Sequence, residues 1–76
     1  MARIKYQLQT GKGKQTNFQV IPDNRTLMRH MKGKIVDNMD ANSISGRPEV
    51  NIGFKDGSYL QIFHLADMLI LNYAKK

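Results

Sequence analysis

The amino-acid sequence predicts a small α+β domain in which two antiparallel β-hairpins form one curved sheet, with a helix between the hairpins. Three observations lead to this prediction. Residues near both ends of the chain alternate between apolar and polar, which is the period of a half-buried strand. Glycine-containing turns interrupt these runs at residues 11–14 and 56–57. Between the two runs, residues 24–40 repeat their apolar side chains at helical spacing.

The length of the chain limits it to one domain, so residues 1–76 are expected to form a single small domain. A chain of 76 residues buries only about 60% of the surface that its unfolded form exposes, which leaves a thin core. The sequence contains no cysteine, so neither a disulfide nor a thiolate metal site can reinforce that core. Stability must then come from packing, which favours a homodimer of two-fold symmetry.

The first hairpin is expected to lie at the N-terminus. Ile4, Tyr6 and Leu8 alternate with polar residues, and the glycines of residues 11–14 supply the turn. The second strand of this hairpin carries Phe18, which is expected in the core, and it ends before Pro22 because proline cannot donate to a sheet ladder.

The second hairpin is expected at residues 49–63, where two alternating runs flank Asp56 and Gly57. An Asp-Gly pair between such runs is typical of a two-residue hairpin turn. This turn pairs Phe54 with Tyr59 and Val50 with Phe63. Phe54 and Phe63 are expected in the core, and both faces of residues 59–63 carry large apolar side chains, which again favours a homodimer.

Two segments allow more than one structure. Residues 24–40 form a helix capped by Asp23 or Asn24, or residues 32–38 form a strand. The helix places apolar residues on one stripe, and Gly33 costs it about 1 kcal/mol relative to alanine. This stripe consists of Met28, Met31, Ile35 and Met39. Residues 65–73 likewise suit a helix or a strand.

The extended alternative for these segments gives an all-β fold. Strands at residues 32–36, 50–58 and 65–68 are similar in spacing to those of small SH3-like barrels. The resemblance covers about half of the chain and implies a closed barrel. The α+β arrangement is preferred, with the order hairpin, helix, hairpin and then a C-terminal helix or strand.

No catalytic, metal or cofactor site is expected. Residues 11–16 lack the spacing of a phosphate-binding loop, and residues 38–49 lack the glycine that a calcium loop requires. His30 and His64 have no second metal ligand at useful spacing. The N-terminus does not resemble a signal peptide, and the longest apolar stretch is far shorter than a membrane span. Together with the absence of cysteine, these features favour a cytoplasmic protein.

The charge distribution favours binding to nucleic acid, either DNA or RNA. The net charge is +6, and residues 1–34 hold eight basic residues against one acidic residue, whereas residues 35–76 hold four against five. A one-sided positive field attracts polyanions. Two tyrosines near lysines, Tyr6 and Tyr59, are candidates for stacking on bases. The predicted phosphate contacts are Arg3, Lys5, Lys12, Lys14, Arg25, Arg29, Lys32 and Lys34.

A protein-interaction module is the alternative function. A small inhibitor or adaptor of this kind docks on a larger protein, with its basic half against an acidic surface. The methionine stripe or the edge of the sheet then supplies the apolar contact.

Overall fold

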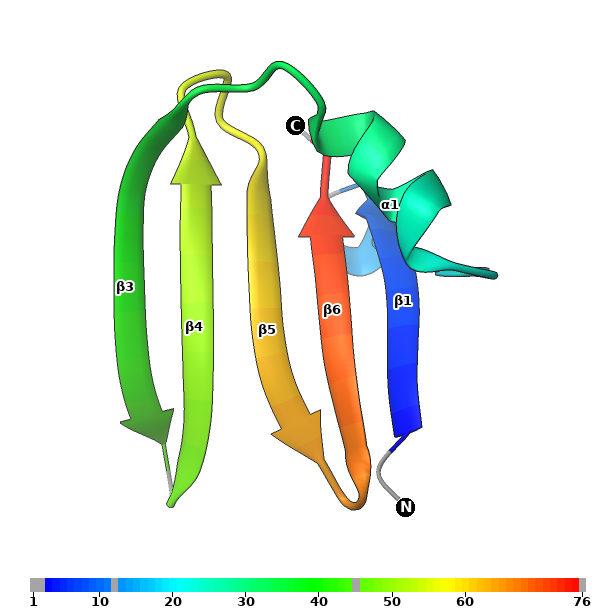
Figure 1. Cartoon of the computed structure of the whole chain (residues 1–76), viewed down its shortest axis with the longest axis vertical. Helices are drawn as coiled ribbons and strands as arrows, with labels where there is room; N and C mark the ends of the chain where they lie inside the picture. Colours follow the sequence, from blue (N-terminus) through cyan, green and yellow to red (C-terminus); the bar gives the residue numbers. More distant parts are fainter. Residues whose placement is uncertain (1–2, 12, 45, 76) are drawn as a thin grey trace.

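The protein consists of one six-stranded mixed sheet with a short helix on one face (Figure 1). The structure is a computed structural model and describes residues 3–11, 13–44 and 46–75. The strand order is β2-β1-β6-β5-β4-β3, and all neighbouring strands are antiparallel except β1 and β6, which are parallel. In chain order the elements are β1 (Arg3–Thr10), the 3-10 helix η1 (Gly13–Gln15), β2 (Asn17–Ile21), α1 (Asn24–Met31), β3 (Val36–Ile44), β4 (Arg47–Phe54), β5 (Tyr59–Leu65) and β6 (Met68–Ala74).

The predicted two-hairpin sheet is wrong, although both predicted hairpins are present as β1–β2 and β4–β5. The two ambiguous segments supply the additional strands, because residues 36–44 form β3 and residues 68–74 form β6. β6 joins the two hairpins by pairing with β1 on one side and with β5 on the other. The alternative of a closed SH3-like barrel is also not observed, since the sheet is open and has β2 and β3 at its edges.

The helix α1 is shorter than residues 24–40 because both of its ends are fixed locally. The Asp23 carboxylate accepts hydrogen bonds from the backbone N and the hydroxyl of Thr26, each at 2.8 Å, so the N-cap is Asp23, one of the two predicted alternatives. At the other end, Gly33 has a φ of 80°, a conformation that glycine adopts freely and that terminates helices. The chain after Gly33 is therefore free to enter β3.

The register between β4 and β5 differs by one residue from the prediction. Gly53 pairs with Tyr59 and Val50 with Ile62, because the turn is longer than the two residues Asp56 and Gly57. The backbone N of Phe54 donates to the carbonyl of Ser58 at 2.9 Å and closes a wider loop. A shift of one residue moves every side chain to the opposite face, so Leu60 and Ile62 lie on the same face as Val50 and Ile52.

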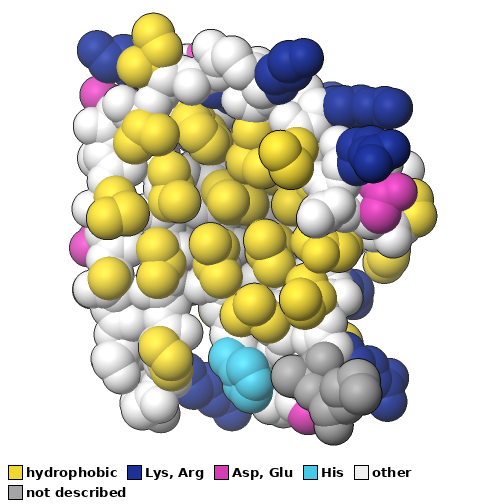
Figure 2. Space-filling view, in the orientation of Figure 1, with side chains coloured by type: hydrophobic (Ala, Val, Ile, Leu, Met, Phe, Trp, Pro, Cys, Tyr) yellow, Lys and Arg dark blue, Asp and Glu magenta, His cyan; other side chains and the backbone are white. Residues whose placement is uncertain are grey.

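One face of the sheet, which we call the helix face, carries α1 and the core. Alternation along each strand places the side chains of Ile4, Tyr6 and Leu8 on this face of β1. Figure 2 shows hydrophobic side chains over the middle of this face and charged side chains around its margin. The buried core cluster consists of Leu8, Ile21, Leu27, Leu60 and Tyr73.

The opposite face, which we call the amide face, carries a network of amide side chains. Asn72 is almost fully buried there, accepts a hydrogen bond from Gln7 at 3.2 Å and donates to Gln9 at 2.8 Å. Gln61 donates to Glu49 on the neighbouring strand. The helix face thus carries the buried core cluster, whereas the amide face combines the amide network with apolar side chains such as Phe18 and Phe63.

Several residues predicted for the core are exposed. Phe18 is 59% exposed, since it projects from β2 on the amide face. Phe54 is half-buried against the core, and Phe63 is half-buried on the amide face. In the predicted apolar stripe, Met31 packs against the core, but Met28, Ile35 and Met39 are exposed because the stripe is divided between α1, a loop and β3.

Candidate nucleic-acid interface

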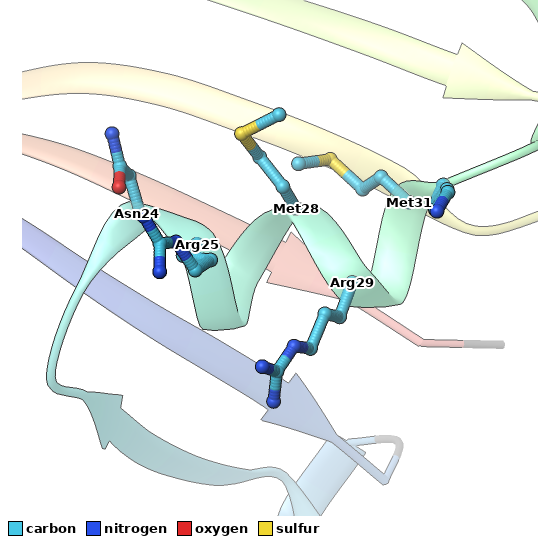
Figure 3. A pocket seen from close by; sticks show the side chains of 6 residues that line it. Asn24, Arg25, Met28, Arg29 and Met31 are labelled. Carbon is cyan, nitrogen blue, oxygen red and sulfur yellow. The ribbon is translucent and has the colours of Figure 1, made fainter.

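A stripe of basic side chains runs along the exposed side of α1. Arg25, Arg29 and Lys32 follow one another at spacings of four and three residues, which places them on one side of a helix. All three are exposed, and α1 itself contains no acidic residue. The rise of a helix gives the stripe a length of about 10 Å. Figure 3 shows Arg29 extending from one side of α1 and Met28 and Met31 from the other.

Three further lysines lie at the end of the sheet where α1 finishes. The backbone N of Lys55 donates to the carbonyl of Ile35 at 2.9 Å, just after α1. The backbone N of Lys75 donates to the carbonyl of Gln9 at 3.0 Å, at the end of β1. Lys14 lies in η1, which follows β1. Lys55 and Lys75 were not predicted, because they come from the half of the sequence that has no excess of positive charge.

Lys34 was predicted to contact phosphate, but it is engaged within the protein. Its Nζ forms an ion pair with Asp56, donates to the Ser58 hydroxyl at 3.0 Å and lies 5.2 Å from the centre of the Tyr73 ring. The hydrogen bond to Asp56 raises the pKa of Lys34. The hydrogen bond from the Lys34 ammonium is the largest cause that holds the pKa of Asp56 well below its ordinary value, and the hydrogen bonds from Ser58 are the next largest. This cluster joins the start of β3 to the β4–β5 turn.

The lowered pKa of Asp56 predicts a loss of stability in acid. A carboxylate whose pKa is lower in the folded than in the unfolded chain stabilises the fold above about pH 4, and this contribution is lost as the pH falls toward the folded-state pKa. We expect the urea midpoint of the protein to fall between pH 4 and pH 2, and to fall less in Asp56→Asn. Asp67→Asn, at the opposite end of the sheet, is the matched control and should behave like the wild type.

The structure does not bring all the predicted contacts together. Arg3 and Lys5 project from β1 on the amide face, whereas α1 lies on the helix face. Arg3 is also at the end of β1 farthest from Lys75, since it pairs with Met68 at the start of β6. Lys12 lies outside the described residues.

The two tyrosines proposed to stack on bases are also separated. Tyr6 is half-buried on the helix face and packs against the core cluster. Tyr59 is partly exposed on the amide face, where it lines a polar hollow with Asn38 and Asn51. Neither ring joins the basic stripe of α1, so the structure does not bring the two tyrosines and the stripe together.

Basic and apolar side chains lie together beside α1. A shallow hollow beside α1 is lined by the basic stripe together with Asn24, Met28 and Met31. Within residues 3–11, 13–44 and 46–75, no three His, Cys, Asp or Glu side chains are grouped so that they could hold a metal ion. The described part of the chain also has no helix long and apolar enough to cross a membrane.

Comparison with protein-family models, with curated proteins and with solved structures finds no match to this chain. The functional assignment therefore depends on the positions and chemistry of the chain's own side chains.

Proposed function

We propose that the protein binds the phosphates of nucleic acid through a basic surface formed by α1 and the adjoining end of the sheet. The observation that supports this most is the exposed stripe of Arg25, Arg29 and Lys32, which carries three positive charges against the single carboxylate of the N-cap Asp23 at the start of α1. Lys55 and Lys75 extend the surface beyond the end of the helix. We call these five residues the basic surface.

Phosphate contacts of this kind hold the protein on the nucleic-acid backbone without reading sequence. Arginine suits this role because its planar guanidinium can donate two hydrogen bonds to one phosphate. Neither Tyr6 nor Tyr59 joins the stripe, so little base recognition is expected. The proposed function is accordingly that of an accessory protein that binds DNA or RNA with low sequence preference.

A salt series tests the proposal with wild-type protein. If all five residues of the basic surface contact duplex phosphates, the slope of log K against log salt should be about −4.5, from roughly −0.9 per contact. Fluorescence anisotropy with a labelled duplex and a labelled single strand measures this slope. Protein that binds neither oligonucleotide at 50 mM salt would contradict the proposal.

A second function is favoured by one other observation, the large apolar area that α1 leaves uncovered on the helix face. Exposed apolar areas of this kind are typical of protein–protein contacts. The second candidate function is therefore the protein-interaction module, which would use this apolar area to bind a second copy of the chain or a different protein.

A further inference from the structure

The two edges of the sheet differ in how well they are protected against pairing with another strand. At the β3 edge the register shifts between Val36 and Asn38. The same strand carries two aspartates, Asp37 and Asp40. Bulges and charged side chains are common ways of preventing edge-to-edge association. β2, at the other edge, contains no charged residue and no proline, and it pairs with β1 in continuous register, so it lacks the features that protect β3.

The outward-facing backbone groups of the β2 edge belong to Phe18 and Val20. The backbone N of Arg3 donates at 3.2 Å to the carbonyl of the residue that precedes β6, so the odd-numbered residues of β1 direct their backbone groups toward β6. The even-numbered residues of β1 therefore face β2, where Leu8 pairs with Gln19. Alternation along β2 then directs the N–H and C=O groups of Phe18 and Val20 away from the sheet, and no strand of the described residues pairs with that side.

The same two residues present large apolar side chains on the amide face. Phe18 is 59% exposed and Val20 is 64% exposed. Side chains that lie directly opposite each other on neighbouring strands are in contact, and aromatic and β-branched pairs stabilise a sheet in this way. A strand added beside β2 therefore buries both side chains if it places apolar residues opposite them.

The helix face of the β2 edge is bordered by positive charge. α1 contacts β1 and β2, and Figure 3 shows Arg29 extending from α1 on the side away from Met28, toward β1 and β2. Arg25 and Lys32 lie on the same side of the helix as Arg29. A strand added beyond β2 lies one strand spacing, about 4.8 Å, farther out. Its side chains on the helix face therefore point toward the layer that contains the basic stripe.

We propose that the β2 edge binds an extended segment of another protein in which apolar residues alternate with acidic ones. The apolar residues lie opposite Phe18 and Val20 on the amide face, and the acidic residues between them face the basic stripe of α1. Backbone hydrogen bonds to Phe18 and Val20 hold the segment, and the side chains on its two faces select it. The proposal does not depend on nucleic-acid binding, although both use Arg29.

A second copy of this chain fits the β2 edge less well. Pairing of β2 with β2 about a two-fold axis brings the basic stripes of the two copies toward each other, because each α1 contacts β1 and β2. The stripe carries three positive charges, and each chain has a net charge of +6. These like charges oppose symmetric pairing, whereas they attract an acidic segment.

Two synthetic peptides test the proposal with wild-type protein. One alternates glutamate with valine over seven residues, and the other has lysine in place of glutamate. We expect the glutamate peptide to bind at least 10-fold more tightly, since only its charges complement the basic stripe. Its binding should protect the amides of Phe18 and Val20 from hydrogen exchange, measured by NMR. Failure of both peptides to bind at about 1 mM, or equal binding of the two, would overturn the proposal.

A matched pair of variants tests whether the backbone of β2 holds the peptide. Val20→Pro removes one outward N–H and leaves the hydrogen bonds to β1 in place, which an edge strand tolerates. It should weaken binding of the glutamate peptide about 10-fold with an unchanged circular dichroism spectrum. Val20→Thr keeps the N–H and the β-branched shape, so its affinity should stay within about threefold of the wild type. Equal affinities of the two variants would contradict strand addition at this edge.

A second pair of variants tests the part played by charge. Arg29→Gln should reduce the preference for the glutamate peptide over the lysine peptide about threefold, because one positive charge beside the added strand is lost. Arg47→Gln removes the same charge from the start of β4, which β5, β6 and β1 separate from β2. It should leave the preference unchanged. Equal effects of the two variants would mean that the preference follows overall charge and would overturn the choice of an acidic partner.

Val20→Pro also separates this proposal from the proposed function. Val20 is not part of the basic surface, so the variant should bind a labelled duplex as tightly as the wild type while it loses affinity for the glutamate peptide. Analytical ultracentrifugation checks the remaining occupant. Self-association of the wild type that Val20→Pro abolishes would show that a second copy of the chain takes the edge, and would overturn the proposal.

Discussion

Replacing Leu27 by alanine is expected to lower the free energy of unfolding by about 3 kcal/mol. Leu27 is only 1% exposed and is the residue of α1 that belongs to the buried core cluster, with Leu8 and Tyr73. The substitution removes the buried part of the helix and leaves a cavity against the sheet. Because a small domain has a total stability of only 5–15 kcal/mol, the effect should be plain in urea denaturation.

The neighbouring residue supplies the control for this prediction. Met28 is largely exposed, so Met28→Ala should change the free energy of unfolding by no more than about 0.5 kcal/mol. If Leu27→Ala does not fold, Leu27→Met, which keeps the volume, should remain folded with a loss below about 1.5 kcal/mol. Equal stability of Leu27→Ala and Met28→Ala would show that α1 is not anchored through Leu27.

Removing the three charges of the α1 stripe is expected to weaken nucleic-acid binding about 500-fold at 0.1 M salt. Each phosphate contact contributes a slope of roughly −0.9, so three contacts account for about 2.7 units of the log–log slope. The variant is Arg25→Gln, Arg29→Gln and Lys32→Gln, in which glutamine preserves helix propensity. Fluorescence anisotropy across a salt series measures both the affinity and the slope.

A second triple variant separates this local effect from the effect of net charge. This variant also loses three positive charges, but from β1 and β4: Arg3→Gln, Lys5→Gln and Arg47→Gln. Arg3 and Lys5 lie on the amide face. This variant should keep most of the affinity and nearly the wild-type slope. Equal losses in the two variants would mean that binding follows overall charge rather than the basic surface.

The sequence predicted the elements whose signals are local. The cap at Asp23 and the alternation of β1 were predicted because a single side chain or a period of two specifies them. The strand at residues 68–74 was ambiguous because its neighbours, β1 and β5, come from distant parts of the chain. The register of β4 and β5 was predicted wrongly because the side chain of Asp56 hydrogen-bonds Ser58 and widens the turn.

The candidate site could be predicted only in part for a similar reason. Charge counting identified Arg25, Arg29 and Lys32, which the helix then places on one side. It could not show that Lys5 projects from the opposite face of the sheet, nor that Lys34 is engaged with Asp56 from a turn 22 residues away. Those outcomes depend on the pairing of β1 with β6 and on the packing of β3 beside β4.

The most direct test of the proposed basic surface is an NMR titration of labelled protein with a short duplex and a short single strand. Backbone amide shifts should change most at residues 25–32 and at Lys55 and Lys75, and the changes should decrease as salt is added. Amides of β3 and of the β5–β6 turn should change little. Changes centred on Arg3 and Lys5, or no changes with either ligand at 50 mM salt, would contradict the account.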